Sequence, residues 1–242
     1  DLHKENGTAT YVDYGDTRSL TQKELADMLA RLGDPSSSLF NIDQGRIGDC
    51  HLLASLNAYN QTEAGRRDLA SLITPHYGAD GKVDGFYVDF PGFDRDRKRV
   101  FVQDVLEYGD TAGGSHNADL GSIFEKAFVQ SHMGGTRGKI PTWGASGSLS
   151  ALTMEDISGK ATHPTVNLGI NRESLKNAAI DAVTTGNPVV AESSPFAGQA
   201  NVTIDGNDQT ITVSSQHVYT VVGADENGVT LTNPWGYNQT TT

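Results

Sequence analysis

Residues 44–54 read Gln44-Gly45-Arg46-Ile47-Gly48-Asp49-Cys50-His51-Leu52-Leu53-Ala54. Two glycines and an aspartate lead into the only cysteine of the chain, and an apolar helical pattern follows it directly. We therefore expect a helix from Cys50 to about Tyr59, with the thiol at its N-terminus. The unpaired N–H groups and the positive dipole end at that position favour a thiolate. This setting indicates a reactive thiol, although a lone cysteine is more often a buried apolar residue.

The residues before the cysteine suit acyl transfer. Gln44 carries a side-chain NH2 that, with the backbone N–H of Cys50, can hold the oxyanion of a tetrahedral intermediate. Gly45 and Gly48 let the loop turn sharply and approach a substrate closely. Asp49 is the last residue of the loop before the thiol. A single cysteine also excludes a disulfide framework within the chain and any thiolate metal cluster.

A thiolate that attacks an amide needs a proton donor for the leaving amine, and histidine suits that task near neutral pH. The chain has seven histidines. His51 directly follows the thiol, but adjacent helical residues point about 100° apart, so it is poorly placed as a base. His217 is the better candidate, because it opens a β-branched stretch that runs to Val222.

A second polar group follows this stretch, in Asn233-Pro234-Trp235-Gly236. A strand pair places His217 and Asn233 at facing ends, where the Asn carbonyl can accept from the imidazole and orient it. Trp235 can cover that hydrogen bond and keep water away from it. Gln44, Cys50, His217 and Asn233 thus form a candidate catalytic set.

Helical patterns dominate the first part of the chain and short β-branched stretches dominate the last. A Thr21–Glu24 capping box opens the first expected helix. Further helices are expected over 120–133, 149–157 and from Asn171 to Gly186, and strands over 86–90, 100–102, 188–191, 201–205, 210–214, 218–223 and 229–232. This order predicts an α+β fold, with a mainly helical lobe over 1–160 and a strand-rich lobe over 161–242.

These motifs resemble the calpain protease core, a branch of the papain-like superfamily. Residues 44–54 are similar to the calpain pattern Q-G-x-x-G-D-C-W-x-x-A, residues 216–221 to G-H-A-Y-S-V, and residues 233–236 match N-P-W-G. Weaker similarity links residues 102–106 to V-D-D-x-L, residues 125–128 to E-K-A-Y, and residues 157–159 to L-T-G. The resemblance therefore covers about residues 38 to 236.

The resemblance implies a two-lobed cysteine endopeptidase with its site between the lobes. Carried over by position, it makes Cys50 the nucleophile, His217 the base, Asn233 the residue that orients it, Gln44 an oxyanion donor and Trp235 a shield over the His–Asn pair. Two positions depart from the pattern. His51 replaces a tryptophan, which predicts a smaller and more polar cleft wall, and residue 216 is Gln where calpains have Gly.

The chemistry itself requires no cofactor, but calpain cores are assembled by calcium, so calcium is a candidate structural activator. No EF-hand pattern occurs. Acidic clusters lie at Asp80, Asp84 and Asp89, at Asp94 and Asp96, and at Asp225 and Glu226, and none aligns with the family's calcium ligands.

Three readings of the function remain open. The first is an endopeptidase that acts on polypeptides. The second keeps the Cys–His site but uses it for another acyl transfer, as in papain-like transglutaminases, deamidases or amidases. The third is a catalytically silent binding module. Divergence from the animal pattern suggests a bacterial effector or toxin module, secreted to act inside a target cell, with a cognate inhibitor or immunity protein as partner.

The net charge and the hydropathy of the chain argue against two classes of partner, nucleic acids and membranes. The formal net charge of −12 disfavours a nucleic-acid surface, because phosphates are repelled. No apolar run approaches the roughly 18 residues that a membrane helix needs. We therefore expect a soluble chain that binds neither nucleic acid nor membrane.

Overall fold

The structure is a computed structural model. It describes residues 14–93, 99–111, 114–133, 140–141, 148–166, 171–195, 198–204, 206–236 and 240–241. The helices are α1 (Gln22–Leu32), α2 (Cys50–Asn60), α3 (Glu63–Ser71), α4 (Leu120–Met133), α5 (Ser150–Ser158) and α6 (Arg172–Thr184). The strands are β1 (Tyr14–Gly15), β2 (Thr17–Ser19), β3 (Ile73–Tyr77), β4 (Val83–Asp89), β5 (Arg99–Val102), β6 (Asp104–Leu106), β7 (Ile140–Pro141), β8 (Val190–Glu192), β9 (Gly198–Ile204), β10 (Asn207–Val213), β11 (Val218–Ala224), β12 (Val229–Thr232) and β13 (Thr240–Thr241).

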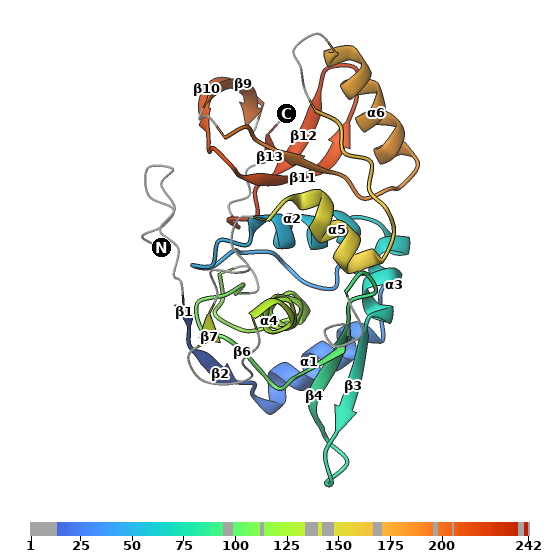
Figure 1. Cartoon of the computed structure of the whole chain (residues 1–242), viewed down its shortest axis with the longest axis vertical. Coiled ribbons are helices and arrows are strands. Elements are labelled where there is room, and N and C mark those ends of the chain that lie inside the picture. Colours follow the sequence, from blue (N-terminus) through green and yellow to red (C-terminus); the bar gives the residue numbers. More distant parts are fainter. Residues whose placement is uncertain are drawn as a thin grey trace.

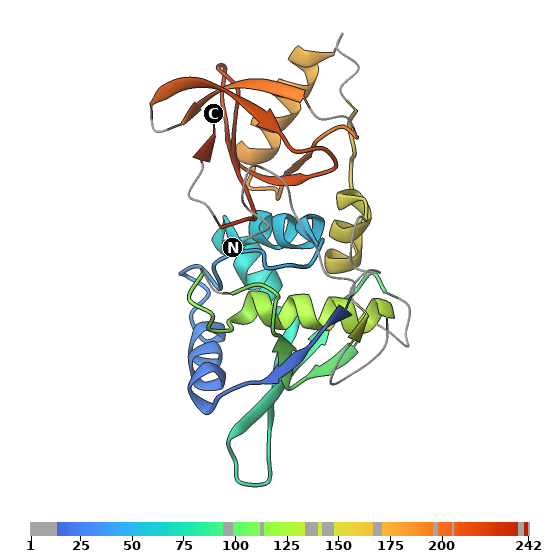
Figure 2. The same cartoon turned by 90° about the vertical axis from the view of Figure 1, so that its left-hand side faces the viewer.

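Helix α4 lies at the centre of the first part of the chain. Figure 1 views it end-on, with α2 and α5 on one side and α1 on the other, and Figure 2 shows it lengthwise between α2 and the strands. The three-stranded sheet β3-β4-β5 packs beside it, and α4 contacts both β4 and β5. Phe86, Phe90, Phe124 and Phe128 are fully buried where these elements meet. Burial of these rings is the main favourable contribution to this part of the fold.

Local signals account for the helix ends. Glu24 N donates to Thr21 Oγ1 at 3.2 Å and Thr21 N donates to Glu24 Oε2 at 2.8 Å, which confirms the predicted capping box at α1. Helix α5 is capped at its C-terminus by Gly159, whose φ of +67° is a conformation that glycine adopts at little cost. Helices α2 and α4 begin at the residues that the apolar pattern predicts.

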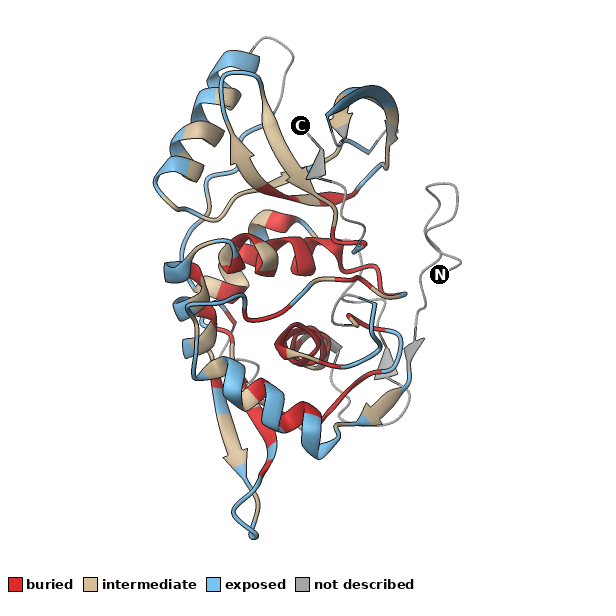
Figure 3. Cartoon of the chain, turned by 180° about the vertical axis from the view of Figure 1, so that it is seen from behind, coloured by how far each residue is buried: buried red, intermediate tan, exposed pale blue. Residues whose placement is uncertain are grey.

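The last part of the chain forms a six-stranded antiparallel sheet in the order β10-β9-β13-β12-β11-β8. Strand β11 contacts α6 and also contacts α2, so it joins the sheet to the helices. Figure 1 shows β11 directly above α2, with α6 at the far end of the sheet. Figure 3 shows that buried residues concentrate around α2 and α4, whereas α6 and most of the sheet are half-buried or exposed.

The predicted α+β class is confirmed. The expected strands of the last part are present, with ends that differ from the expected ones by one to three residues where they differ. Helix α3 and strand β3 were not predicted. Asn171 is the N-cap of α6 but makes no side-chain capping hydrogen bond, and its Nδ2 donates to Val166 O. Within the described residues, no helix is both long enough and apolar enough to cross a membrane.

Candidate active site

Cys50 is the first residue of α2 and lies beneath β11. It is only 7% exposed and packs with Ala54, Val190 and Val218 in a small apolar cluster. Because it opens the helix, its backbone N–H belongs to the groups that have no intrahelical partner. The predicted position of the thiol at a helix N-terminus, facing the strand-rich part of the chain, is therefore present.

Burial opposes the predicted thiolate. It raises the pKa of the Cys50 thiol to about 11, with smaller contributions from the negative charges of Asp49 and Glu192. Backbone hydrogen bonds from Val218 and His51 oppose the shift without cancelling it. The sequence pattern shows the helix N-terminus but cannot show that β11 removes the thiol from water, and the cost of desolvation outweighs the benefit of the helix end.

The backbone of His217 is held by Ser193, the residue that follows β8. His217 N donates to Ser193 Oγ at 2.9 Å, and Ser193 N donates to His217 O at 2.9 Å. Gln216, the residue before it, has a φ of +50°, which is a left-handed conformation. The glycine of the calpain pattern fits such a position at little cost, and Gln216 occupies it here with some strain.

The imidazole of His217 is oriented by Asn233. His217 Nε2 lies 2.9 Å from Asn233 Oδ1, which also accepts from Trp235 N at 3.1 Å. A backbone N–H can only donate, so the atom it meets is the oxygen of the amide, and His217 Nε2 must carry the proton. In the neutral ring, Nδ1 is then the nitrogen with a free lone pair, as a general base requires.

Two aromatic rings enclose this imidazole. The centroid of Trp235 lies 4.5 Å from that of His217, and the centroid of Tyr219 lies 4.8 Å away in an edge-to-face arrangement. Together they leave His217 2% exposed. Burial lowers the pKa of His217, and the hydrogen bond to Asn233 opposes that shift. Tyr219 belongs to this site although the sequence patterns did not single it out.

The thiol and the imidazole do not form a hydrogen bond with each other in the described structure, although Cys50 packs against Val218, the residue after His217. Burial therefore favours the neutral form of both groups.

Gln44 is close to the site but directs its amide elsewhere. Its Nε2 donates to Ile47 O at 2.6 Å and makes a longer contact of 3.4 Å with Asp49 Oδ1. The side chain is fully buried, and its Oε1 has no hydrogen-bond partner among the described residues. The oxyanion role of Gln44 stays a prediction, and it requires the second N–H of the amide, now directed toward Asp49, to point at the substrate.

The loop of Gln44 contacts the Asn-Pro-Trp-Gly turn directly. Gln44 N donates to Pro234 O at 2.8 Å, so the two motifs meet through their backbones. Gly236 has a φ of +74°, and a Cβ there would lie 2.3 Å from Asp43 Oδ1. Only glycine satisfies both conditions. A Cβ on Gly45 would likewise lie 2.0 Å from Tyr108 O, so this glycine is needed for contact with the protein's own backbone.

Buried carboxyl groups support the loop before the thiol. Gly48 is buried in the bend, and the Asp49 carboxyl that follows interacts with the carboxyl of Glu125 from α4. Glu125 also accepts from Asp110 N at 3.0 and 3.1 Å. Burial raises the pKa of Asp49 to about 7 and those of Glu125 and Asp110 well above their ordinary range.

A shared proton explains an otherwise unpaired atom in this group. With both carboxyl groups ionised, Asp49 Oδ2 has no donor. A proton on Glu125 supplies one, which fits the raised pKa of Glu125 and leaves its second oxygen free to accept from Asp110 N. Glu125 was noticed in the sequence only as part of the E-K-A-F stretch, because its partners come from two distant loops.

The position of the His51 side chain differs from one expectation. It is fully buried, its Nδ1 lies 2.8 Å from Thr153 Oγ1, and its ring packs against Phe128. The prediction of a polar cleft wall at this position is wrong, because the side chain faces the interior between α4 and α5. The prediction that His51 is badly placed as the base agrees with this contact.

The acidic clusters are occupied with local partners. Asp84 pairs with His76, Asp89 with Arg99, and Asp80 accepts from Lys82 N. Asp225 accepts from the N–H groups of the β11–β12 turn, and Asp94 and Asp96 lie outside the described residues. Among the residues that are described, no three His, Cys, Asp or Glu side chains are placed to hold one metal ion. No calcium site is assigned, and calcium activation stays a prediction.

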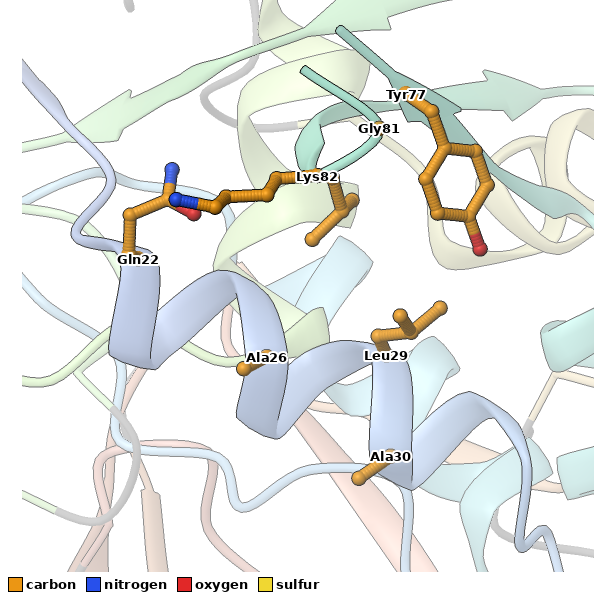
Figure 4. A pocket seen from close by; sticks show the side chains of 8 residues that line it. Gln22, Ala26, Leu29, Ala30, Tyr77, Gly81 and Lys82 are labelled. Atoms are coloured by element: carbon orange, nitrogen blue, oxygen red, sulfur yellow. The ribbon is translucent and has the colours of Figure 1, made fainter.

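A separate groove of about 490 Å³ lies between α1 and the β3–β4 hairpin. Figure 4 shows Leu29 and Ala26 of α1 facing Tyr77 and Lys82 of the hairpin. None of its lining residues belongs to the site around Cys50, so it provides no part of the candidate chemistry.

A scan of the sequence against protein-family models gives no match, and a search of curated proteins gives none either.

Proposed function

We propose that the chain is a papain-like cysteine endopeptidase of the calpain type, with Cys50, His217 and Asn233 as its catalytic triad. The observation that carries the proposal is the 2.9 Å contact from His217 Nε2 to Asn233 Oδ1, which leaves Nδ1 as the basic nitrogen of a residue whose neighbour, Val218, packs against Cys50. Two lobes, over residues 1–160 and 161–242, belong to the same proposal, with the site where α2 meets β11.

The first half of the reaction forms an acyl-enzyme. The thiol proton of Cys50 passes to His217 Nδ1, and the thiolate sulfur attacks the peptide carbonyl carbon. The developing oxyanion is held by the backbone N–H of Cys50, joined by the second N–H of the Gln44 amide once it turns from Asp49. His217 then gives its proton to the leaving nitrogen, the C–N bond breaks, and the amine product departs.

The second half restores the enzyme. His217 Nδ1 takes a proton from water as the water oxygen attacks the thioester carbonyl. The C–S bond breaks, the acid product leaves, and Cys50 recovers its proton from His217. Asn233 keeps the ring in one orientation throughout, and Trp235 limits the access of water to the Asn233–His217 hydrogen bond.

The neutral resting pair requires an activating step in this proposal. Substrate binding, or the calcium effect that the calpain resemblance implies, must bring Cys50 and His217 within hydrogen-bond distance. Once they are in contact, each charged form stabilises the other, and the cost of burying a single charge falls. A polypeptide is the proposed substrate, while an inhibitor or immunity partner and an effector role stay predictions.

The test is proteolysis of an unstructured protein such as casein, with and without calcium, by the parent chain and by Cys50→Ala. We expect fragments from the parent and at least a thousandfold fewer from the variant, because the covalent step is lost. A calcium requirement would appear as cleavage in one arm only. Equal cleavage by both proteins would contradict the proposal, since the activity would not depend on the thiol.

A further inference from the structure

Glu192 lies on the face of the sheet that covers the thiol. It ends β8, and the antiparallel register places it directly opposite Val218 of β11. Residues opposite each other in such a pair project from the same face of the sheet. Val218 packs against Cys50, so the side chain of Glu192 is on the same side as the nucleophile.

The carboxylate of Glu192 is held in place by α5. Its Oε2 accepts from Ser150 Oγ at 2.9 Å and from Ser150 N at 3.3 Å. Leu149, the residue before the helix, has no side chain that can cap it, so Glu192 supplies the acceptor and the negative charge that a helix N-terminus favours. Glu192 nevertheless remains exposed, and its Oε1 has no hydrogen-bond partner among the described residues.

The electrostatic surroundings of the thiol are negative. The charged groups that act on Cys50 are Asp49 and Glu192, and both raise the pKa of the thiol. Asp49 is fully buried and engaged with Glu125, so a substrate cannot reach it. Glu192 is the exposed residue of the two, and its hydrogen bonds with Ser150 hold its carboxylate in place. A group that binds near Cys50 therefore meets one anchored carboxylate.

We propose that Glu192 is a specificity residue that favours a Lys or Arg side chain next to the scissile bond. This inference rests on the proposed endopeptidase function and adds a substrate class to it. A partly exposed ion pair gives discrimination of up to about fivefold. The same carboxylate disfavours acidic side chains at that position, because its negative charge repels theirs.

Charged thiol reagents test the electrostatic part without any need for proteolysis. Cys50 is the only thiol, so its rates of reaction with a trimethylammonium-ethyl and a sulfonatoethyl methanethiosulfonate are unambiguous. We expect the ratio of cationic to anionic rates to fall about three- to tenfold in Glu192→Gln and to depend on ionic strength in the parent. Glu192→Gln keeps an oxygen acceptor for Ser150, which preserves the cap of α5.

Glu226→Gln is the matched control. It removes the same charge from an exposed site in the turn at the far end of β11, and we expect it to leave the ratio unchanged. An equal ratio in the parent and Glu192→Gln would overturn the inference. An equal fall in both variants would also overturn it, because net charge rather than position would then govern the rates.

Peptides that differ only in Lys, Gln or Glu beside one cleavage site test the substrate class. We expect the parent to prefer Lys over Gln and Gln over Glu in kcat/KM, and Glu192→Gln to lose that order. Cleavage of all three at equal rates overturns the inference and leaves the proposed function intact. No cleavage of any peptide or of casein counts against the proposed function and the substrate class together, and the thiol reagents then still decide whether Glu192 controls charge at Cys50.

Discussion

The part of the chain that carries Cys50 and the part that carries His217 differ in how densely they are packed. Around α2 and α4, the core is continuous and includes four fully buried phenylalanines. In the last part, α6 has no buried residue and every residue of β12 is only half-buried. Cys50 thus belongs to a helix of the well-packed part, whereas His217 and Asn233 are held by a thinner sheet.

Because of this difference, the position of Cys50 relative to His217 depends on the contacts between the two parts. Thr220 Oγ1 donates to Ala54 O at 2.9 Å and accepts from Asn57 Nδ2 at 3.2 Å. The backbone hydrogen bond from Gln44 to Pro234 and the close approach of Gly236 to Asp43 join the loop before Cys50 to the Asn233–Gly236 turn. The geometry of the site therefore depends on a few polar and backbone contacts more than on a shared core.

The largest effect is expected on the unfolding free energy when one apolar side chain is removed from each of the two parts. Phe128→Ala removes a fully buried ring from α4 and should cost about 3–5 kcal/mol of unfolding free energy. Leu231→Ala in half-buried β12 should cost about 1–2 kcal/mol, because less apolar area leaves water there. Urea unfolding of both variants measures the difference, and equal costs would show that the two parts are packed alike.

A smaller effect is expected at the contact between the catalytic loops. Gly236→Ala adds a Cβ where Asp43 Oδ1 lies 2.3 Å away and should move the Asn233 turn, so we expect activity to fall more than tenfold. Gly81→Ala is the matched control, because its φ of +77° is similar but nothing lies within 4 Å of the new atom. Each variant loses about 1–2 kcal/mol to the left-handed backbone. Similar activity in the two variants would show that the contact with Asp43 is unimportant.

The smallest of these effects concerns the shared proton below the thiol. The raised pKa values of Asp49 and Glu125 mean that the folded state binds more protons than the unfolded chain above about pH 4. Their stabilising contribution is therefore complete below that pH and is lost as the pH rises through about 7. Glu125→Gln keeps a neutral donor for Asp49, so its unfolding free energy should fall less steeply from pH 5 to pH 8.

The difference between parent and variant, measured by urea unfolding at each pH, cancels the titration of other groups. It should change by roughly 1 kcal/mol for each pH unit in this window. Glu107→Gln, an exposed substitution, should leave the pH profile of the parent unchanged. A difference that grows in favour of the parent with rising pH would contradict the shared proton.

Local signals made the main elements predictable. The Thr21–Glu24 box and the apolar spacing after Cys50 act within one or two helical turns, so they specified α1 and α2 correctly. Strand β3 was missed because Pro75 interrupts its pattern, which an edge strand tolerates. The His217–Asn233 contact was predictable because the two residues flank β11 and β12, which pair with each other.

The electrostatics of the site was not predictable from local patterns. The pKa of Cys50 depends on burial by β11, more than 160 residues away in the chain. The Asp49–Glu125 pair joins a loop to α4, and Glu192 reaches the thiol only through its register opposite Val218. Such long-range contacts leave no periodic trace in the sequence, so only the three-dimensional structure reveals them.

The most direct test of the catalytic pair is the rate at which a peptidyl chloromethyl ketone alkylates Cys50 in the parent and in His217→Ala. Peptide mapping locates the adduct, and iodoacetamide labelling in urea shows that the thiol is intact in both proteins. We predict one adduct per chain at Cys50, formed at least about 100-fold faster in the parent, because His217 activates the bound thiol. Equal rates in the two folded proteins would contradict the assignment of His217 as the base of a cysteine peptidase.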